Sequence, residues 1–292
     1  MTQEQREYLR GWLERQESFG ECLTPEQTGS ARSVKREQLE ETELLMVGEP
    51  ERFVVWQTGL TLEGTGEPLS RVWGWQAPQS ELPRLFSESS SRLKPGLLAI
   101  DRRVDGEPSP KVLQGCGFEL QRHRLVLFPR AHNLQEERYR DFTLRAAGDL
   151  DRPLLINLAS ETLAFTLPPG EDDRIDLYSE SLLSKYQVLD YGSDSPYDLL
   201  LAEHRPTRSA VGYILLFEDE NGYICLDDLA VKREQWGKYV GHFMVRSVEN
   251  LLVEHGYPVM YAEISQANRR SFLTAQRQLH FRPDLQYWLK RS

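Results

Sequence analysis

The sequence predicts an α/β protein with two domains, and three observations support this fold class. The chain has 292 residues, which favours two domains of ordinary size, each with its own core. Strand-like and helix-like patterns alternate along residues 142–292, an order typical of a mixed sheet flanked by helices. Residues 237–255 carry apolar side chains at the spacing of one helix face, so this helix is expected to pack on the sheet. We place the two domains at residues 1–130 and 141–292.

The first domain begins with two segments that have polar helical patterns. We expect these two helices at 4–19 and 33–47 to serve as packing elements. Clusters of aromatic and β-branched residues between turns predict strands, and helical spacing predicts two short helices. The expected elements are strands at 51–64, 69–76 and 96–101, helices at 80–93 and from 109 to 115, and a strand pair within 118–130. The polar stretch 131–141 is interpreted as a linker.

The second domain has clearer element boundaries. Asp149 or Asp151 caps a helix whose first turn contains Pro153. Asn221-Gly222 is a strong hairpin signal, and Gly256 suits a left-handed helix end. The expected elements are strands at 142–147, 197–204, 209–220, 223–231, 257–265 and 282–292, and helices at 148–165, 174–187, 237–255 and 268–281.

Composition and charge exclude several classes of protein. Acidic residues outnumber basic ones by 45 to 35, and the net charge of -10 disfavours a nucleic-acid partner. No apolar run is long enough to span a bilayer, and the polar first residues lack a signal peptide, so we expect a cytoplasmic protein without a membrane partner.

Neither the cysteines nor the histidines form a metal motif. The three cysteines lie far apart and are interpreted as buried, unpaired thiols: Cys22, Cys116 and Cys225. The six histidines show no HxxxH or HExxH spacing, so no metal is expected.

The segment "EQWGKYVGHFMV", residues 234–245, places two glycines and a lysine at the start of the predicted helix. A helix start offers unpaired backbone N–H groups and a positive dipole end, so the segment could hold a phosphate. Its spacing is neither a Walker A loop nor a Rossmann fingerprint, and a purely structural turn is the alternative.

The order of elements around this segment resembles the GNAT acetyltransferase superfamily across residues 141–291. In that family a short apolar triplet ends the fourth strand, and a loop of the form R/Q-x-x-G-x-G/A receives the pyrophosphate of acetyl-CoA. Here Trp236 stands at the Arg/Gln position, Tyr239 at the first glycine and Gly241 at the last position. The resemblance implies that the acetyl-CoA-binding residues are Leu229, Ala230, Val231, Trp236, Gly237, Lys238, Tyr239, Val240, Gly241, Asn268 and Ser271. Tyr239 fits this loop if it already belongs to the helix.

The resemblance also implies a reaction in which an amine attacks the thioester directly. Backbone N–H groups of the splayed fourth strand would stabilise the thioester oxygen, and a base would take the amine proton. Asp227 and Asp228 are the candidate bases; the alternative is a polar strand end that faces solvent. Gln276 stands where many members carry a tyrosine acid, so His280 is a candidate acid, with a packing role as its alternative.

A faint internal repeat suggests a second copy of this fold. Residues 93–130 and 255–291 both give strand, turn, short helix, x-Phe and strand. No glycine turn of the pyrophosphate type occurs between Trp73 and Ser91. We therefore expect a GNAT-like mixed sheet flanked by helices in the C-terminal domain and a smaller, degenerate GNAT-like N-terminal domain, a tandem arrangement; chance similarity of common α/β parts is the alternative.

The sequence thus favours an acetyl-CoA-dependent N-acetyltransferase with a small-molecule amine as acceptor, and the acidic balance favours a cationic amine. A homodimer is a possible assembly. The alternative function is a non-catalytic acyl-CoA-binding or interaction module on the same fold, and transfer of a longer acyl group is a further alternative.

Overall fold

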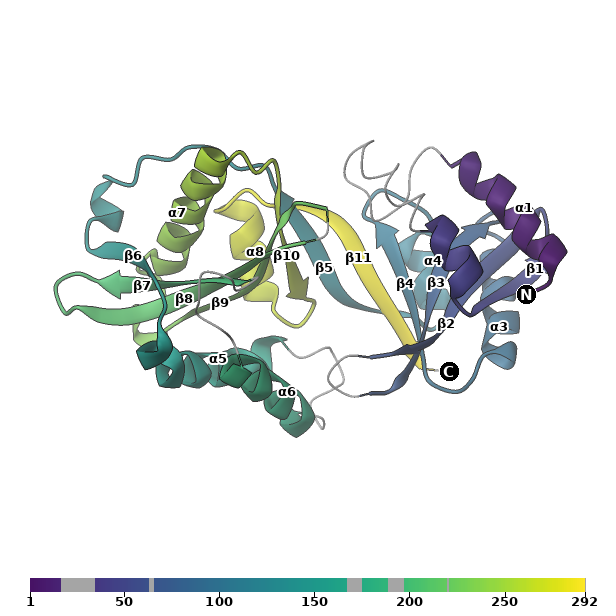
Figure 1. Cartoon of the computed structure of the whole chain (residues 1–292), viewed down its shortest axis with the longest axis horizontal. Helices are drawn as coiled ribbons and strands as arrows, with labels where there is room; N and C mark the ends of the chain where they lie inside the picture. Colours follow the sequence, from purple (N-terminus) through teal and green to yellow (C-terminus); the bar gives the residue numbers. More distant parts are fainter. Residues whose placement is uncertain (17–34, 63–65, 167–174, 189–196, 220, 292) are drawn as a thin grey trace. The chain divides into compact units, whose positions relative to one another are not determined.

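The computed structural model describes the chain except for residues 17–34, 63–65, 167–174, 189–196, 220 and 292. The chain divides into two compact units, drawn in Figure 1. Unit 1 contains Met1–Arg122 and Leu285–Ser292, and unit 2 contains His123–Asp284. None of the described helices is long and apolar enough to cross a membrane.

Unit 1 is a sheet with helices on both faces. Its strands follow the order β1, β2, β3, β4, β11; β3 and β4 are parallel and the other neighbours are antiparallel. The elements are α1 (Gln3–Glu14), β1 (Leu44–Glu49), β2 (Arg52–Thr61), β3 (Pro68–Gln76), α3 (Leu82–Arg92), β4 (Leu97–Arg103), α4 (Pro110–Gly115) and the unit 1 parts of β5 (Glu119–Leu127) and β11 (Arg282–Arg291). Helix α1 buries Leu9, Trp12 and Leu13 against one face, and α3 buries Leu85 and Phe86 against the other.

One strand of unit 1 corrects the sequence prediction. Residues 35–41 are helical, but Leu44–Glu49 forms β1, where the sequence predicts one continuous helix over 33–47. The alternating side chains of β1 explain the difference, because Met46 packs in one core and Val47 in the other. A strand buried on both faces has a continuous apolar run, which cannot be told from a buried helix by its pattern.

The strands of unit 2 follow the order β10, β9, β8, β7, β6. Strands β9 and β10 are parallel, and the other neighbours are antiparallel. The elements are η1 (Glu137–Tyr139), β6 (Phe142–Ala146), η2 (Asp149–Asp151), α5 (Arg152–Thr166), α6 (Ile175–Val188), β7 (Tyr197–His204), β8 (Ser209–Glu218), β9 (Ile224–Val231), η4 (Arg233–Gln235), α7 (Val240–His255), β10 (Met260–Ser265) and α8 (Arg269–Arg277). The predicted order of elements in this half is confirmed.

The helices of unit 2 cover the two faces of its sheet (Figure 1). Helices α7 and α8 pack on one face through Phe243, Met244 and Ala275. Helices α5 and α6 pack on the other face through Leu155, Leu158 and Tyr186. Side chains of β9 therefore alternate between the α7 side and the α5–α6 side.

The two units repeat one topology, which supports the predicted internal repeat. Each has three antiparallel strands, a helix, a parallel strand and a short helix: β1–β2–β3–α3–β4–α4 in unit 1 and β7–β8–β9–α7–β10–α8 in unit 2. The strand that follows each short helix passes into the other unit. Strand β5 begins in unit 1 and ends in unit 2, and β11 begins in unit 2 and ends in unit 1. The compact units thus differ from a division at residues 130 and 141.

Two smaller predictions change in detail. Residues 118–130 give the single strand β5 where a strand pair is expected. Cys225 is buried and free as predicted, whereas Cys116 is free and partly exposed; Cys22 lies outside the described residues.

Candidate functional site

Strands β9 and β10 separate at the carboxyl end of β9. Their pairing joins Ile224–Leu226 to Met260–Ala262 and stops there, while β9 stays paired with β8 as far as Val231. From Asp227 onward, one edge of β9 therefore has no strand partner among the described residues. The splayed strand that the resemblance implied is present, and an unpaired edge leaves backbone N–H groups available to another acceptor.

A β-bulge lies where the two strands part. Asp228 of β9 pairs with Leu215 and Leu226 pairs with Leu216, so Asp227 is an extra residue in β9. Bulges of this kind bend a strand and redirect its side chains, and they recur beside active sites.

The loop that follows β9 folds back on the end of the strand. The indole Nε1 of Trp236 donates to the carbonyl oxygen of Val231 at 2.8 Å. Gly237 and Tyr239 both have left-handed backbone, with φ of 82° and 64°. Helix α7 begins only at Val240, so Tyr239 does not belong to the helix and the condition for its fit to the loop is not met. The backbone of Tyr239 thus has the left-handed conformation that glycine, the family's residue at this position, adopts without strain.

The start of α7 presents a row of free amides. The first backbone bond of the helix runs from the N–H of Phe243 to the carbonyl of Tyr239. In the part of the chain that the structure describes, the N–H groups of residues 239–242 have no hydrogen-bond acceptor. Four such amides at the positive end of a helix dipole form a favourable anion site.

Gly241 brings this helix start against the predicted triplet. A Cβ at Gly241 would lie 3.7 Å from the side chains of both Leu229 and Val231, which is ordinary contact. Leu229 and Val231 face α7, and Ala230 between them lies in the core under α5. The structure therefore brings together the triplet and the loop, which the sequence analysis assigned to one site. Val240 is buried in the α7 core, and the exposed Lys238 donates its N–H to the carbonyl of Gln235.

The two candidate bases of β9 have different surroundings. Asp227 makes an ion pair with Lys185 of α6 and a hydrogen bond with the same side chain. Asp228 accepts hydrogen bonds on Oδ2 from the hydroxyls of Tyr186 and Tyr213, each at 2.6 Å. The reading of Asp228 as a polar strand end that faces solvent is therefore wrong.

The three oxygens around Asp228 form a closed triangle, because the two tyrosine hydroxyls lie 3.0 Å apart. With Asp228 ionised, two hydroxyl protons serve three oxygen–oxygen contacts, so the cluster has place for one further proton. Burial raises the pKa of Asp228, and the two hydroxyl donors act against that rise. Burial and the neighbouring carboxylate also raise the pKa of both tyrosines, which keeps them protonated. The arrangement suits a carboxylate that accepts a proton.

The remaining candidates lie in α8 and the turn after it. Asn268 caps α8, since its side-chain Oδ1 accepts from the N–H of Ser271 at 3.1 Å. Ser271 is exposed on this first turn. His280 is exposed and has φ of 66° in the turn before β11, a position where the resembling family has glycine. No described contact joins His280 to Asp227 or Asp228.

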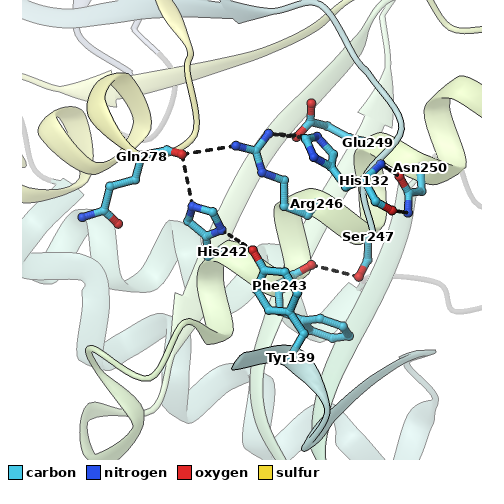
Figure 2. A network of polar contacts seen from close by, with 9 residues as sticks. All are labelled: His132, Tyr139, His242, Phe243, Arg246, Ser247, Glu249, Asn250 and Gln278. Carbon is cyan, nitrogen blue, oxygen red and sulfur yellow. Dashed lines mark hydrogen bonds and ion pairs between the residues drawn. The ribbon is translucent and has the colours of Figure 1, made fainter. Parts of the chain in front are cut away.

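A polar network on α7, shown in Figure 2, was missed by the sequence analysis. Arg246 and Glu249 are charged residues outside the apolar spacing of this helix, yet they are 5% and 0% exposed. Arg246 donates to Glu249 at 2.6 Å, and the ring of His132 lies 3.0 Å from the same carboxylate. The segment 131–141 covers this face, because His132 and Asn250 also exchange two hydrogen bonds. The predicted linker is thus a packed part of unit 2.

His242 connects this network to the free amides. Its Nε2 lies 3.1 Å from the carbonyl oxygen of Gln278, which can only accept, so Nε2 carries a proton. Its Nδ1 lies 2.7 Å from the hydroxyl of Tyr139 and accepts from it in the neutral ring. Burial lowers the pKa of His242, in agreement with this neutral tautomer. The sequence signal for this contact is Tyr139, an aromatic residue in a stretch that is otherwise rich in charged residues.

Part of the chain matches a family model, and solved structures share its fold. Residues 164–281 match the model of the acetyltransferase (GNAT) family. A GCN5-related N-acetyltransferase from Sphaerobacter thermophilus has 16% identity and a TM-score of 0.55, over 89% of this chain and 85% of that chain. A conserved protein of unknown function from Staphylococcus epidermidis ATCC 12228 has 13% identity and a TM-score of 0.53, over 86% of this chain and 95% of that one. A tandem GNAT protein from the clavulanic acid biosynthesis pathway covers 99% of this chain and 95% of its own, with 11% identity and a TM-score of 0.45. No curated protein matches.

Proposed function

Because residues 164–281 belong to the acetyltransferase (GNAT) family, we propose that this chain is an acetyl-CoA-dependent N-acetyltransferase whose acceptor is a small amine. The observation that carries the proposal is the coincidence of two features at one end of β9: the opening between β9 and β10, and the free amides of residues 239–242. A diphosphate fits the amides, and the extended arm of the thioester fits beside the unpaired edge of the strand.

The reaction at this site is direct transfer of an acetyl group. The amine nitrogen forms a bond to the thioester carbon, the carbon–sulfur bond breaks, and the sulfur leaves as a thiolate. Unpaired N–H groups of β9 beyond Leu226 are suited to stabilise the thioester oxygen as it gains negative charge. The amine must lose a proton in the same sequence of steps, so a base has to lie close to the strand end.

Asp228 is our proposed base. Its carboxylate lies directly before the triplet and is held by Tyr186 and Tyr213, and its raised pKa makes it a stronger proton acceptor than an ordinary aspartate. Asp227 is the weaker candidate, since Lys185 already neutralises it. His280 is our proposed proton donor to the thiolate. We also propose that the acyl group is acetyl and that the acceptor is a small amine, because the family match alone identifies neither.

The first experiment is calorimetric titration of acetyl-CoA into the full chain. We expect micromolar binding. We expect Gly241→Glu to abolish it, because the new carboxylate would occupy the space at the amides and repel the phosphates of the ligand. Gly241→Ala is the matched control: its Cβ makes only ordinary contacts at 3.7 Å, so binding should persist. Absence of binding by the native chain would end the enzyme hypothesis.

The second experiment measures thiol release with a panel of small amines. Asp228→Asn should lower kcat by about 100-fold or more, as expected for loss of a general base, with little change in acetyl-CoA affinity. Asp227→Asn is the matched control and should have a much smaller effect. His280→Gly tests the proposed acid, because glycine keeps the left-handed turn and removes only the imidazole. Binding of acetyl-CoA without turnover of any amine would instead favour a non-catalytic acyl-CoA-binding module.

A further inference from the structure

Trp236 is held in a fixed place beside the free amides of α7. Its Nε1 donates to the carbonyl oxygen of Val231 at 2.8 Å, so the indole stays at the end of β9. The residue is nevertheless 37% exposed, an unusual amount for tryptophan. An anchored, exposed indole offers a flat face on which a cationic side chain can stack.

Two arginines from different elements lie over this indole. The guanidinium carbon of Arg270, in the first turn of α8, lies 4.5 Å from the ring centre. The guanidinium carbon of Arg233, in η4, lies 5.9 Å from the same ring centre. Both arginines are exposed. Stacking on an indole orients a guanidinium. The N–H groups of the guanidinium point outward in its own plane, where they can bind an anion.

The local charge supports an anionic ligand. The chain has a net charge of -10, yet residues 232–241 and 268–271 contain five basic residues and one acidic residue, Glu234. The basic residues are Lys232, Arg233, Lys238, Arg269 and Arg270. These two segments flank the opening between β9 and β10, so positive charge gathers there against the trend of the whole chain.

We propose that Arg233 and Arg270, oriented by Trp236, bind the 3′-phosphate of the CoA acyl donor. This inference rests on the proposed function, in which the amides of residues 239–242 hold the diphosphate. The arginines lie beside those amides and not among them, so they suit a second anionic group of the same ligand. A phosphate monoester offers the geometry that guanidinium groups bind most strongly, with paired N–H donors. The two arginines thus make the site specific for a thioester whose nucleotide carries a 3′-phosphate.

The test compares CoA with dephospho-CoA, which lacks only the 3′-phosphate. Calorimetry on the full chain should show CoA binding about 10-fold to 100-fold tighter than dephospho-CoA, the usual range for charge-assisted hydrogen bonds. Arg270→Met and Arg233→Met should each reduce this ratio several-fold by weakening CoA alone. Trp236→Leu should reduce the ratio although both arginines remain, because the ring that orients them is lost. Arg269→Met, next to Arg270 in sequence and also exposed, should keep the native ratio.

The outcomes separate this inference from the proposed function. Equal affinity of the native chain for CoA and dephospho-CoA would overturn the inference and leave the acetyltransferase proposal standing. A ratio that survives in both methionine variants would also overturn it. If the native chain bound neither ligand, the proposed function would fail, and the inference with it.

Discussion

At the scale of single residues, the neutral tautomer of His242 has a consequence for stability at low pH. Burial, followed by the charges of Arg246, Arg138 and His132, lowers the pKa of His242 in the folded chain, and only its bond to the carbonyl of Gln278 opposes them. The unfolded chain binds this proton at the ordinary value of about 6.5. As the pH falls through that value the unfolded state gains a proton that the folded state lacks, so stability present above it is lost.

We therefore expect His242→Asn to reduce the loss of unfolding free energy between pH 7.5 and pH 5.5, because asparagine cannot gain the proton. Urea titrations at both pH values measure the difference. A His242→Asn variant that lost as much stability as the native chain would contradict the assignment. His123 has a similarly lowered pKa and accounts for part of the remaining loss.

Some residues of the site could be predicted from the sequence and others could not. The free amides before Phe243 follow from a local feature, a glycine-bearing turn before a helical pattern, and this feature is written in consecutive residues. The hydroxyl cluster on Asp228 is different, because Tyr186 and Tyr213 approach it from a helix and a neighbouring strand. Nothing in the spacing of these residues shows that three chain segments will meet. The burial of Arg246 and Glu249 could not be predicted for the same reason, because it depends on a distant segment. Both look like ordinary polar helix positions, and residues 131–141 cover them in the fold.

At the scale of elements, Gly212 determines how closely β8, β9 and α7 approach one another. A Cβ at this position would lie 2.7 Å from the carbonyl oxygen of Ala230 and 3.2 Å from Cε of Met244. The first contact is with backbone, which cannot move without shifting β9. Gly212→Ala should therefore destabilise the chain by about 1–3 kcal/mol, as overpacking does. Because Ala230 belongs to the triplet beside the proposed site, the variant should also weaken acetyl-CoA binding.

Urea unfolding of Gly212→Ala, together with calorimetry, measures both effects. Gly148→Ala is the matched control in the same unit, since a Cβ there has no neighbour within 4 Å. Unchanged stability of Gly212→Ala would show that β8 and β9 separate at little cost, and the tight packing behind the triplet would then be unimportant.

Elements such as α7 could be predicted because their apolar spacing is local, whereas the close approach at Gly212 depends on partners that the sequence pattern does not identify.

At the scale of the whole molecule, most of the last strand of the chain belongs to a unit that its sequence pattern does not indicate. Strands β5 and β11 have similar patterns and follow similar short helices, so each was placed with the half that precedes it. A strand pattern specifies that a strand forms and which face is buried, but not which strand becomes its neighbour. Residues Leu285–Arg291 pair with β4 in unit 1, although the rest of unit 1 ends far earlier in the chain, at Arg122.

Trp288 tests this exchange. It pairs with Ile100 of β4, is 2% exposed and packs in the core of unit 1. Trp288→Ala should remove about 3–5 kcal/mol, the usual cost of truncating a buried aromatic residue. Hydrogen exchange should then show faster exchange in β4 of unit 1, while α7 of unit 2 keeps its protection. Tyr287→Ala is the matched control, because Tyr287 is adjacent and only partly buried, and its effect should be smaller. Loss of protection in α7 equal to that in β4 would mean that the two units unfold as one, and that Trp288 stabilises the whole chain and not unit 1 alone.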